Sequence, residues 1–230
     1  MEPPSSDDAD SVRDEKLKVL RSLRPFSAAD VAQYVVRGQY RAGSIAGHAV
    51  KAYRDEPGVD PESTTETFVA LRAEVENWRW AGVPFFIRTG KKLPKRATEI
   101  AIQFNTAPHA MFTSPDNGAI PMRPNLLILR IQPEEGISLR FLSKQPGGGM
   151  RLRPVSMDFN YGSSFGERSP SAYETLLVDA LAGDATLYTR QDMVEASWVV
   201  VEPIQNAWRE RRFEFPNYAA GSWGPAAADE

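Results

Sequence analysis

The stretch that decides the fold places an apolar run directly before a dense group of cations. It reads Gly82-Val83-Pro84-Phe85-Phe86-Ile87-Arg88-Thr89-Gly90-Lys91-Lys92-Leu93-Pro94-Lys95-Arg96. The apolar run predicts a strand over residues 83–89, and Gly90 frees the backbone to turn after it. No acid lies among the cations, although the chain as a whole has a net charge of −3. This contrast predicts a site for a small phosphorylated or carboxylated molecule. Charge alone favours the alternative, a solvated loop whose lysines protect a sheet edge.

The composition excludes several classes of site. The chain has 230 residues, of which 42% are hydrophobic, so it can bury a sizeable core. It has no cysteine, which excludes disulfides, thiolate zinc sites and cysteine nucleophiles. No segment approaches the roughly 18 consecutive apolar residues of a membrane helix, and the basic residues do not recur as the face that nucleic acid would need. We therefore expect a cytoplasmic protein that binds neither membrane nor nucleic acid.

The two histidines offer no catalytic or metal site. His48 lies between Gly47 and Ala49, and His109 follows a proline in a loop, so neither has a neighbouring acid or nucleophile. A catalytic base needs such a partner, and a metal ion needs several ligands at a recognisable spacing. We expect no catalytic residue and no metal ligand in this chain.

The periodicity of apolar residues predicts strands followed by helices. Strands are expected over residues 31–40, 65–77, 83–89, 99–104, 125–132, 137–144 and 150–161. Helices are expected over residues 11–23 with Ser11 as the N-cap, near residues 48–53, over residues 171–182 with Gly183 as the stop, and over residues 192–212. A meander of five or six antiparallel strands between helices indicates an α+β fold without a Rossmann domain.

The distribution of polar and apolar residues also predicts how the chain is divided. Residues 1–10 have little to pack and should form a flexible lead-in. Residues 11–214 should form one α+β domain. Residues 215–230 show no periodicity, so we expect a C-terminal tail that lies over the surface or frays.

Several motifs occur together in an order that resembles one known family. They are Arg13-Asp14-Glu15-Lys16, Gly38-Gln39-Tyr40, Asn77-Trp78-Arg79-Trp80, Gly82-Val83-Pro84-Phe85, Arg88-Thr89-Gly90-Lys91 and Ala220-Gly221-Ser222-Trp223-Gly224-Pro225. With them, nearly the whole chain resembles the C-terminal domain of bacterial-type glucose-6-phosphate dehydrogenase. The resemblance implies a large, mainly antiparallel sheet with helices packed on one face. It also implies that the other face of the sheet pairs with a second subunit in a homodimer.

The resemblance implies a substrate, a coenzyme and a set of binding residues. Family members oxidise glucose 6-phosphate to 6-phosphogluconolactone in the oxidative pentose phosphate pathway, and a separate Rossmann domain binds the NADP. The substrate lies between the two domains. The resemblance places Lys91 and Arg96 on the phosphate side of the pocket and Gln132 near the substrate.

A second, structural NADP in animal members gives a further comparison. Arg88 and Arg130 match positions that contact this molecule. Ala97 and Ala101, however, replace basic residues of the same site. The resemblance therefore supports Arg88 and Arg130 only as candidate contacts to a structural NADP.

The catalytic motifs of the family precede the part that this chain resembles. Neither His48 nor His109 lies in the motif of the family's catalytic histidine. We therefore expect the chain alone to bind substrate and dimerise without oxidising the sugar, and a separate Rossmann-domain chain to complete the enzyme. The alternatives are a non-catalytic regulatory module that forms mixed dimers with the full-length enzyme, and a non-functional remnant.

Overall fold

A computed structural model describes residues 2–108, 123–148, 151–166, 170–210 and 214–229. The contacts between residues divide the chain into two compact units. Unit 1 consists of residues 1–95 and 171–230, and unit 2 consists of residues 96–170. Because unit 2 is inserted into unit 1, the two ends of the chain belong to the same unit.

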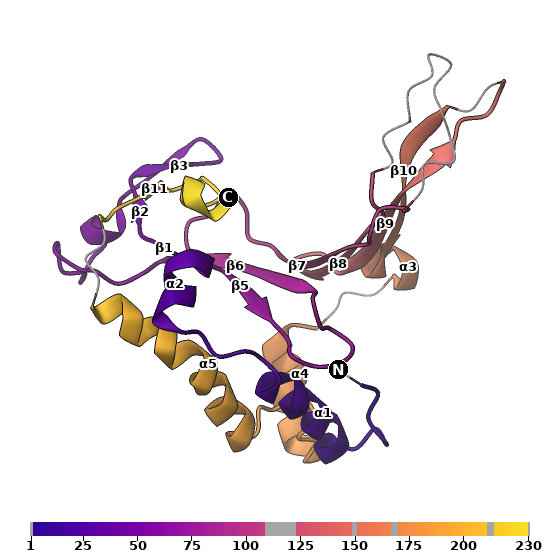
Figure 1. Cartoon of the computed structure of the whole chain (residues 1–230), viewed down its shortest axis with the longest axis horizontal. Coiled ribbons are helices and arrows are strands. Elements are labelled where there is room, and N and C mark those ends of the chain that lie inside the picture. The colour runs from indigo at the N-terminus through magenta and orange to yellow at the C-terminus, as the bar shows by residue number, and fades with distance from the viewer. Residues whose placement is uncertain (1, 109–122, 149–150, 167–169, 211–213, 230) are drawn as a thin grey trace. The chain divides into compact units, whose positions relative to one another are not determined.

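Runs of strands lie between groups of helices along the chain, and Figure 1 labels these elements. The helices are α1 (Ala9–Arg21), α2 (Ala28–Tyr34), α3 (Tyr161–Phe165), α4 (Ala172–Ala182) and α5 (Gln191–Arg209), with short 3-10 turns η1 (Tyr53–Asp55) and η2 (Ala226–Asp229). The strands are β1 (Val35–Gly38), β2 (Tyr40–Arg41), β3 (Gly43–Ile45), β4 (His48–Val50), β5 (Phe68–Glu74), β6 (Pro84–Gly90), β7 (Thr98–Gln103), β8 (Leu126–Gln132), β9 (Gly136–Lys144), β10 (Leu152–Asn160) and β11 (Tyr218–Ala219). This mixture of antiparallel sheets and helices confirms the α+β class.

Unit 1 is built on a three-stranded antiparallel sheet in the order β1-β5-β6. Side chains of β5 alternate between its two faces, as the period of a strand requires. Val69, Leu71 and Ala73 pack with the helices on one face, whereas Phe68 and Ala70 pack with the C-terminal segment on the other. The strand is therefore buried from both sides.

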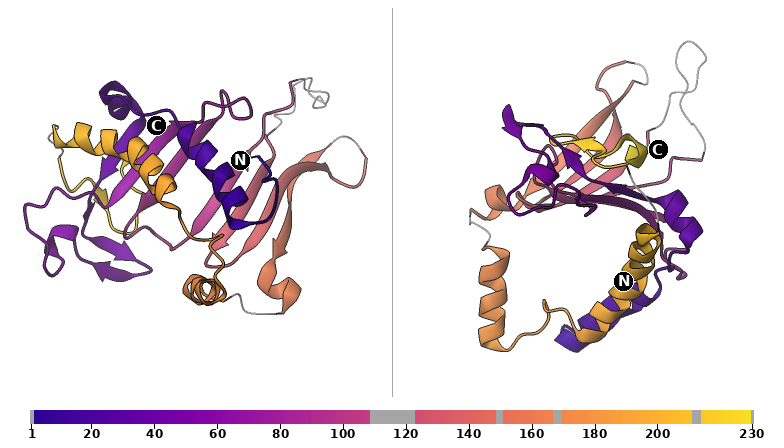
Figure 2. Two further views of the ribbon diagram at one scale, coloured as in Figure 1. Left: turned by 90° about the horizontal axis from the view of Figure 1, so that it is seen from below. Right: turned by 90° about the vertical axis from the view of Figure 1, so that its left-hand side faces the viewer.

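Side chains of α2 and α5 pack on the helix face of this sheet, and Figure 2 shows α5 lying across it. Val31 of α2 and Ile204 and Trp208 of α5 are buried there, together with Phe26. Residues four apart on a helix lie on the same face, so the pair on α5 presents one apolar stripe to the sheet. Burying such side chains stabilises the unit by roughly 1.5–3 kcal/mol each.

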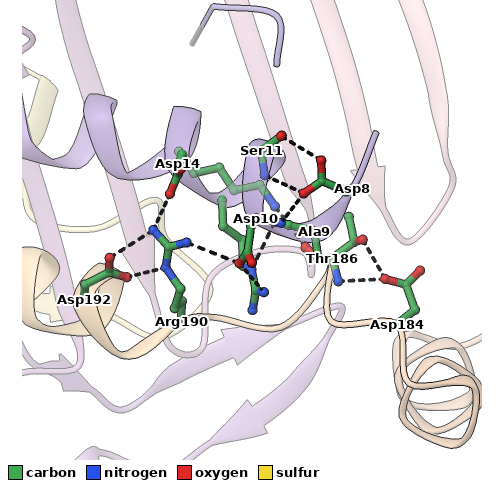
Figure 3. A network of polar contacts seen from close by, with 11 residues as sticks. Asp8, Ala9, Asp10, Ser11, Asp14, Asp184, Thr186, Arg190 and Asp192 are labelled. Carbon is green, nitrogen blue, oxygen red and sulfur yellow. Dashed lines mark hydrogen bonds and ion pairs between the residues drawn. The ribbon is translucent and has the colours of Figure 1, made fainter. Parts of the chain in front are cut away.

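A polar network joins the start of α5 to α1 (Figure 3). The Arg190 guanidinium donates to the Asp192 carboxylate at 2.8 and 3.0 Å and to Asp14 of α1 at 2.5 Å. A weaker contact of 3.4 Å reaches Asp10. These hydrogen bonds lower the pKa of the Asp192 carboxyl and raise that of Arg190. Asp10 and Asp14 are exposed and the other two groups are half-buried, so the network contributes more to the orientation of the two helices than to stability.

The opposite face of the sheet is covered by the C-terminal segment, which the sequence predicted to fray or lie over the surface. The segment lies over the sheet but does not fray, because β11 pairs in parallel with β2 and Tyr218 is only 3% exposed. Glycines allow the close approach: a Cβ added at Gly224 would stand 2.3 Å from the Phe68 ring. Tyr218, Tyr40 and Phe68 thus form one buried aromatic cluster with Ala220.

Unit 2 contains a four-stranded antiparallel sheet in the order β10-β9-β8-β7. The predicted hairpin between β8 and β9 is confirmed, with Leu129 opposite Ile137 and Arg130 opposite Gly136. β8 is an inner strand as predicted, but its side chains are half-buried or exposed. α3 follows directly at the end of β10.

Three local predictions are wrong for identifiable reasons. Residues 31–34 are helical because Ser27 and Asp30 form a capping box that starts α2 at Ala28. α1 starts at Ala9 because the Asp8 carboxylate caps it in place of Ser11. Residues 48–50 form a strand because Ala46 and Gly47, both with positive φ, make a tight turn between β3 and β4.

Candidate functional site

The three predicted substrate-binding residues lie at strand ends. Lys91 follows the last residue of β6 in unit 1. In unit 2, Arg96 comes two residues before β7, and Gln132 is the last residue of β8, opposite Thr98 of β7. The pairing of β7 with β8 therefore places Arg96 and Gln132 at the same end of the unit 2 sheet. All three side chains are exposed.

The turn after β6 is held tightly although its side chains are exposed. Gly90 pairs with Phe68 of β5, and a Cβ added at Gly90 would stand 2.8 Å from the Phe68 ring. Lys92 adopts a φ of 52°, a conformation that non-glycine residues seldom take. Lys91 thus projects from a backbone whose course is fixed on both sides.

The cations around Lys91 differ in their partners. Arg88 donates to the Asp229 carboxylate and to the Ala228 carbonyl, each at 2.6 Å. Lys92 lies 3.8 Å from Glu56, and the Lys95 ammonium lies 6.0 Å from the centre of the Trp223 ring. These three cations are engaged within unit 1.

Lys91 and Arg96 are the two cations of this run that have no such partner. No hydrogen bond, ion pair or ring contact joins either side chain to another residue in the described ranges. An exposed cation without an internal partner keeps its donors available for an anion. The solvated-loop alternative also expects exposed, unpaired cations, so it is the resemblance that selects Lys91 and Arg96.

Arg130 is partly enclosed within unit 2. Its guanidinium lies 3.4 Å from the Phe159 carbonyl and 3.8 Å from Asp158, and its Nε is buried without a hydrogen-bond partner in the described structure. Gly136 leaves room for it, since a Cβ there would stand 2.7 Å from an Arg130 nitrogen. Arg88 is already engaged by the C-terminal segment. The structural-NADP contacts suggested for Arg88 and Arg130 stay a prediction.

The histidines, the potential metal ligands and the hollows add no further site among the described residues. His48 is exposed on β4, and His109 lies outside the described residues. The described residues contain no group of three or more potential metal ligands, and no helix among them is long and apolar enough to cross a membrane. A hollow of about 410 Å³ lies between Arg72 and Pro84, and another of about 890 Å³ lies near Trp208; Lys91 lines neither.

No sequence pattern marks the residues that hold Lys91 in place. Tyr218 is buried, and its hydroxyl lies 2.9 Å from the Lys91 carbonyl oxygen. It is far from Lys91 in the sequence and stands in a segment without periodicity. Burial raises the pKa of Tyr218, so the hydroxyl stays protonated near neutral pH.

Comparisons with known proteins show the family. The family described as "Glucose-6-phosphate dehydrogenase, C-terminal domain" matches residues 1–230. The chain belongs to the glucose-6-phosphate dehydrogenase family. It is 52% identical over 232 residues to the glucose-6-phosphate 1-dehydrogenase of Aggregatibacter actinomycetemcomitans, and 49% identical over 229 residues to that of Rhizobium meliloti.

Solved structures of glucose-6-phosphate dehydrogenases share the fold. The enzyme from Mycobacterium avium is 36% identical, with a TM-score of 0.79 over 99% of this chain. A glucose-6-phosphate dehydrogenase in complex with its substrate glucose-6-phosphate is 35% identical, with a TM-score of 0.83 over 98% of this chain. The chain spans about half the length of these proteins: 45% of the two sequence relatives and 44% of the two solved chains.

Proposed function

We propose that this chain supplies the glucose 6-phosphate-binding and dimerisation part of an NADP-dependent glucose-6-phosphate dehydrogenase. The complete enzyme would oxidise glucose 6-phosphate to 6-phosphogluconolactone in the oxidative pentose phosphate pathway of the cytoplasm. The coenzyme, bound mainly by a Rossmann domain, accepts the hydride. The residues of this chain bind and orient the sugar phosphate, and without the Rossmann half the chain is inactive.

One observation carries the proposal for the binding site. Within the run of cations from residue 88 to residue 96, the charged groups of Lys91 and Arg96 lack partners in the described structure, whereas Arg88, Lys92 and Lys95 have them. A phosphate dianion is recognised by charge-assisted hydrogen bonds from such groups. Gln132, exposed at the end of β8, has an amide that can both donate to and accept from sugar hydroxyls.

Support for dimerisation comes from the family and from apolar side chains on strands. Phe86 of β6 is 77% exposed, and Met157 of β10 is 63% exposed. Exposed apolar side chains on a sheet are typical of an interface. We propose that a second copy of the chain covers a sheet face that carries such exposed apolar side chains.

The test mixes the 230-residue chain with the separately produced Rossmann half of a relative and measures NADPH formation from glucose 6-phosphate. We expect activity in the mixture and none from the chain alone. Lys91→Ala and Arg96→Ala should each raise the KM for glucose 6-phosphate by about tenfold or more, because each removes a charge-assisted hydrogen bond of roughly 1.5–3 kcal/mol. Lys95→Ala is the matched control, since Lys95 already has a ring partner.

Each other outcome points to a different conclusion. An unchanged KM in both variants would contradict the assignment of Lys91 and Arg96. Activity from the chain alone would show that it contains a catalytic base. A folded dimer that stays silent in the mixture would favour a regulatory module or a remnant.

A further inference from the structure

The backbone of Lys91 is held on both sides by buried groups. Its N–H donates to the Thr67 carbonyl at 2.8 Å, and its carbonyl accepts a hydrogen bond from the Tyr218 hydroxyl at 2.9 Å. The next carbonyl, that of Lys92, accepts from the Gly221 N–H at 2.8 Å. The start of β5 and the C-terminal segment therefore fix the peptide groups on which the Lys91 side chain is mounted.

The surroundings of Tyr218 determine where its single hydroxyl proton points. The Tyr40 N–H donates to Thr67 Oγ1 at 3.1 Å, and this hydroxyl lies 3.0 Å from the Tyr218 oxygen. When Thr67 Oγ1 donates its proton to the Tyr218 oxygen, the Tyr218 proton points to a carbonyl. The Lys91 carbonyl is nearer to it than the Thr67 carbonyl, at 2.9 against 3.2 Å.

The resulting chain of hydrogen bonds runs from the Tyr40 amide through two hydroxyls to the Lys91 carbonyl. Each bond polarises the next, and burial strengthens all of them. Thr67 is 8% exposed and Tyr218 is 3% exposed, so water does not compete for these groups. The Tyr218 ring is also held in place, 5.5 Å from the Phe68 ring and 6.3 Å from the Tyr40 ring.

The unusual conformation of Lys92 shows that this restraint is needed. Its φ of 52° is unfavourable for a residue with a Cβ and persists where the surroundings impose it. Without the hydrogen bonds to Tyr218 and Gly221, the turn could relax towards a more common conformation. The Lys91 ammonium would then occupy a wider range of positions.

We propose that Tyr218 is a positioning residue for substrate binding, acting through its hydroxyl on the Lys91 backbone. The proposal rests on the proposed function, in which Lys91 binds the phosphate of glucose 6-phosphate. It assigns to the C-terminal segment a role in affinity in addition to its role in packing. Tyr218 itself contacts no substrate.

The test compares Tyr218→Phe with Tyr40→Phe, a matched control in the same buried cluster. The Tyr40 hydroxyl lies 3.3 Å from Glu56 and does not contact Lys91, so each variant removes one hydroxyl group from this aromatic cluster. Two quantities are measured on the full 230-residue chain by NMR. One is the exchange rate of the Lys91 amide proton, and the other is the affinity for titrated glucose 6-phosphate.

We expect Tyr218→Phe to accelerate exchange of the Lys91 amide and to weaken glucose 6-phosphate binding by about fivefold, since one neutral hydrogen bond contributes about 1 kcal/mol. Tyr40→Phe should change both quantities by less than about twofold. In the active mixture, Tyr218→Phe should raise KM and leave kcat unchanged. A general loss of structure would instead lower the amount of active enzyme and with it the apparent kcat.

Separate outcomes overturn the two proposals. If Tyr218→Phe and Tyr40→Phe have equal effects on Lys91 exchange, Tyr218 does not hold this backbone. A second outcome is that Tyr218→Phe accelerates Lys91 exchange but leaves the affinity for glucose 6-phosphate unchanged, whereas Lys91→Ala weakens that affinity. In that case the hydrogen bond from Tyr218 to the Lys91 backbone has no role in binding. If Lys91→Ala also leaves affinity unchanged, or the unaltered chain shows no binding, the role of Tyr218 in affinity falls together with the proposed site.

Discussion

Gly221 illustrates how one residue without a Cβ admits the C-terminal segment. It has a φ of +85°, and an added Cβ would stand 1.9 Å from the Ser44 carbonyl oxygen. Gly58 has a similar φ of +80°, but nothing lies within 4 Å of the position of its Cβ. Replacing Gly58 by alanine therefore tests the cost of the backbone conformation alone, whereas replacing Gly221 tests that cost together with a steric clash.

We predict that Gly221→Ala destabilises the protein much more than Gly58→Ala. The left-handed conformation alone should cost about 1–2 kcal/mol at Gly58. At Gly221 the clash with Ser44 adds to this, and the total should reach about 4 kcal/mol or more. Urea unfolding followed by tryptophan fluorescence measures both free energies of unfolding. An equal decrease in the free energy of unfolding in the two variants would contradict this prediction. It would show that the C-terminal segment moves away from Ser44 without an energetic cost.

At the scale of elements, α2 and α4 begin with the same capping box but differ in packing. Ser27 with Asp30 starts α2, and Ser171 with Glu174 starts α4. Val31 of α2 is only 2% exposed, whereas α4 contains no buried residue. The same chemical change should therefore have different consequences at the two caps.

We predict that Ser27→Ala lowers the global free energy of unfolding by about 1 kcal/mol, because α2 must be formed for the core to close. Ser171→Ala removes an equivalent hydrogen bond, but α4 can fray without opening the core. It should leave the urea midpoint unchanged and accelerate amide exchange within residues 172–182. A lowered midpoint for Ser171→Ala would mean that α4 is coupled to the core.

Elements formed by local patterns were predictable from the sequence. The alternation along β5, the hairpin of β8 and β9, and the stop of α4 at Gly183 all depend on residues close in the sequence. Residues 31–34 were misread because their β-branched and aromatic side chains suit a strand, while the capping box at Ser27 decides for a helix. A helix cap and tertiary packing that both favour a helix thus outweigh the strand propensity of these side chains.

The candidate site was only partly predictable for a related reason. The run of cations and the resemblance selected Lys91 and Arg96. Which neighbours are engaged depends on groups distant in the sequence, such as Asp229 for Arg88 and Trp223 for Lys95. The hydrogen bond from Tyr218 to Lys91 spans 127 positions and leaves no periodic signal.

At the scale of the whole molecule, the order of the chain separates the two units. Unit 1 needs segments from both sides of unit 2, since Tyr218 of β11 pairs with Tyr40 of β2 across 178 positions. Unit 2 is continuous from residue 96 to residue 170, and its strand pairs are close in the sequence. Bringing β11 next to β2 closes a long loop and costs conformational entropy. This cost is offset only when the core of unit 1 is fully formed.

We therefore predict that removing residues 216–230 opens unit 1 and leaves the sheet of unit 2 protected. The deletion takes away Tyr218 and Ala220, which bury Phe68 and complete the second core cluster. Hydrogen exchange measured by mass spectrometry should rise strongly in peptides of β5 and stay low in peptides of β9. Removing residues 2–7, most of which are exposed, is the control and should change neither set of peptides. Equal loss of protection in β5 and β9 after the C-terminal deletion would show that the two units fold as one, because the contacts of unit 2 would then depend on those of unit 1.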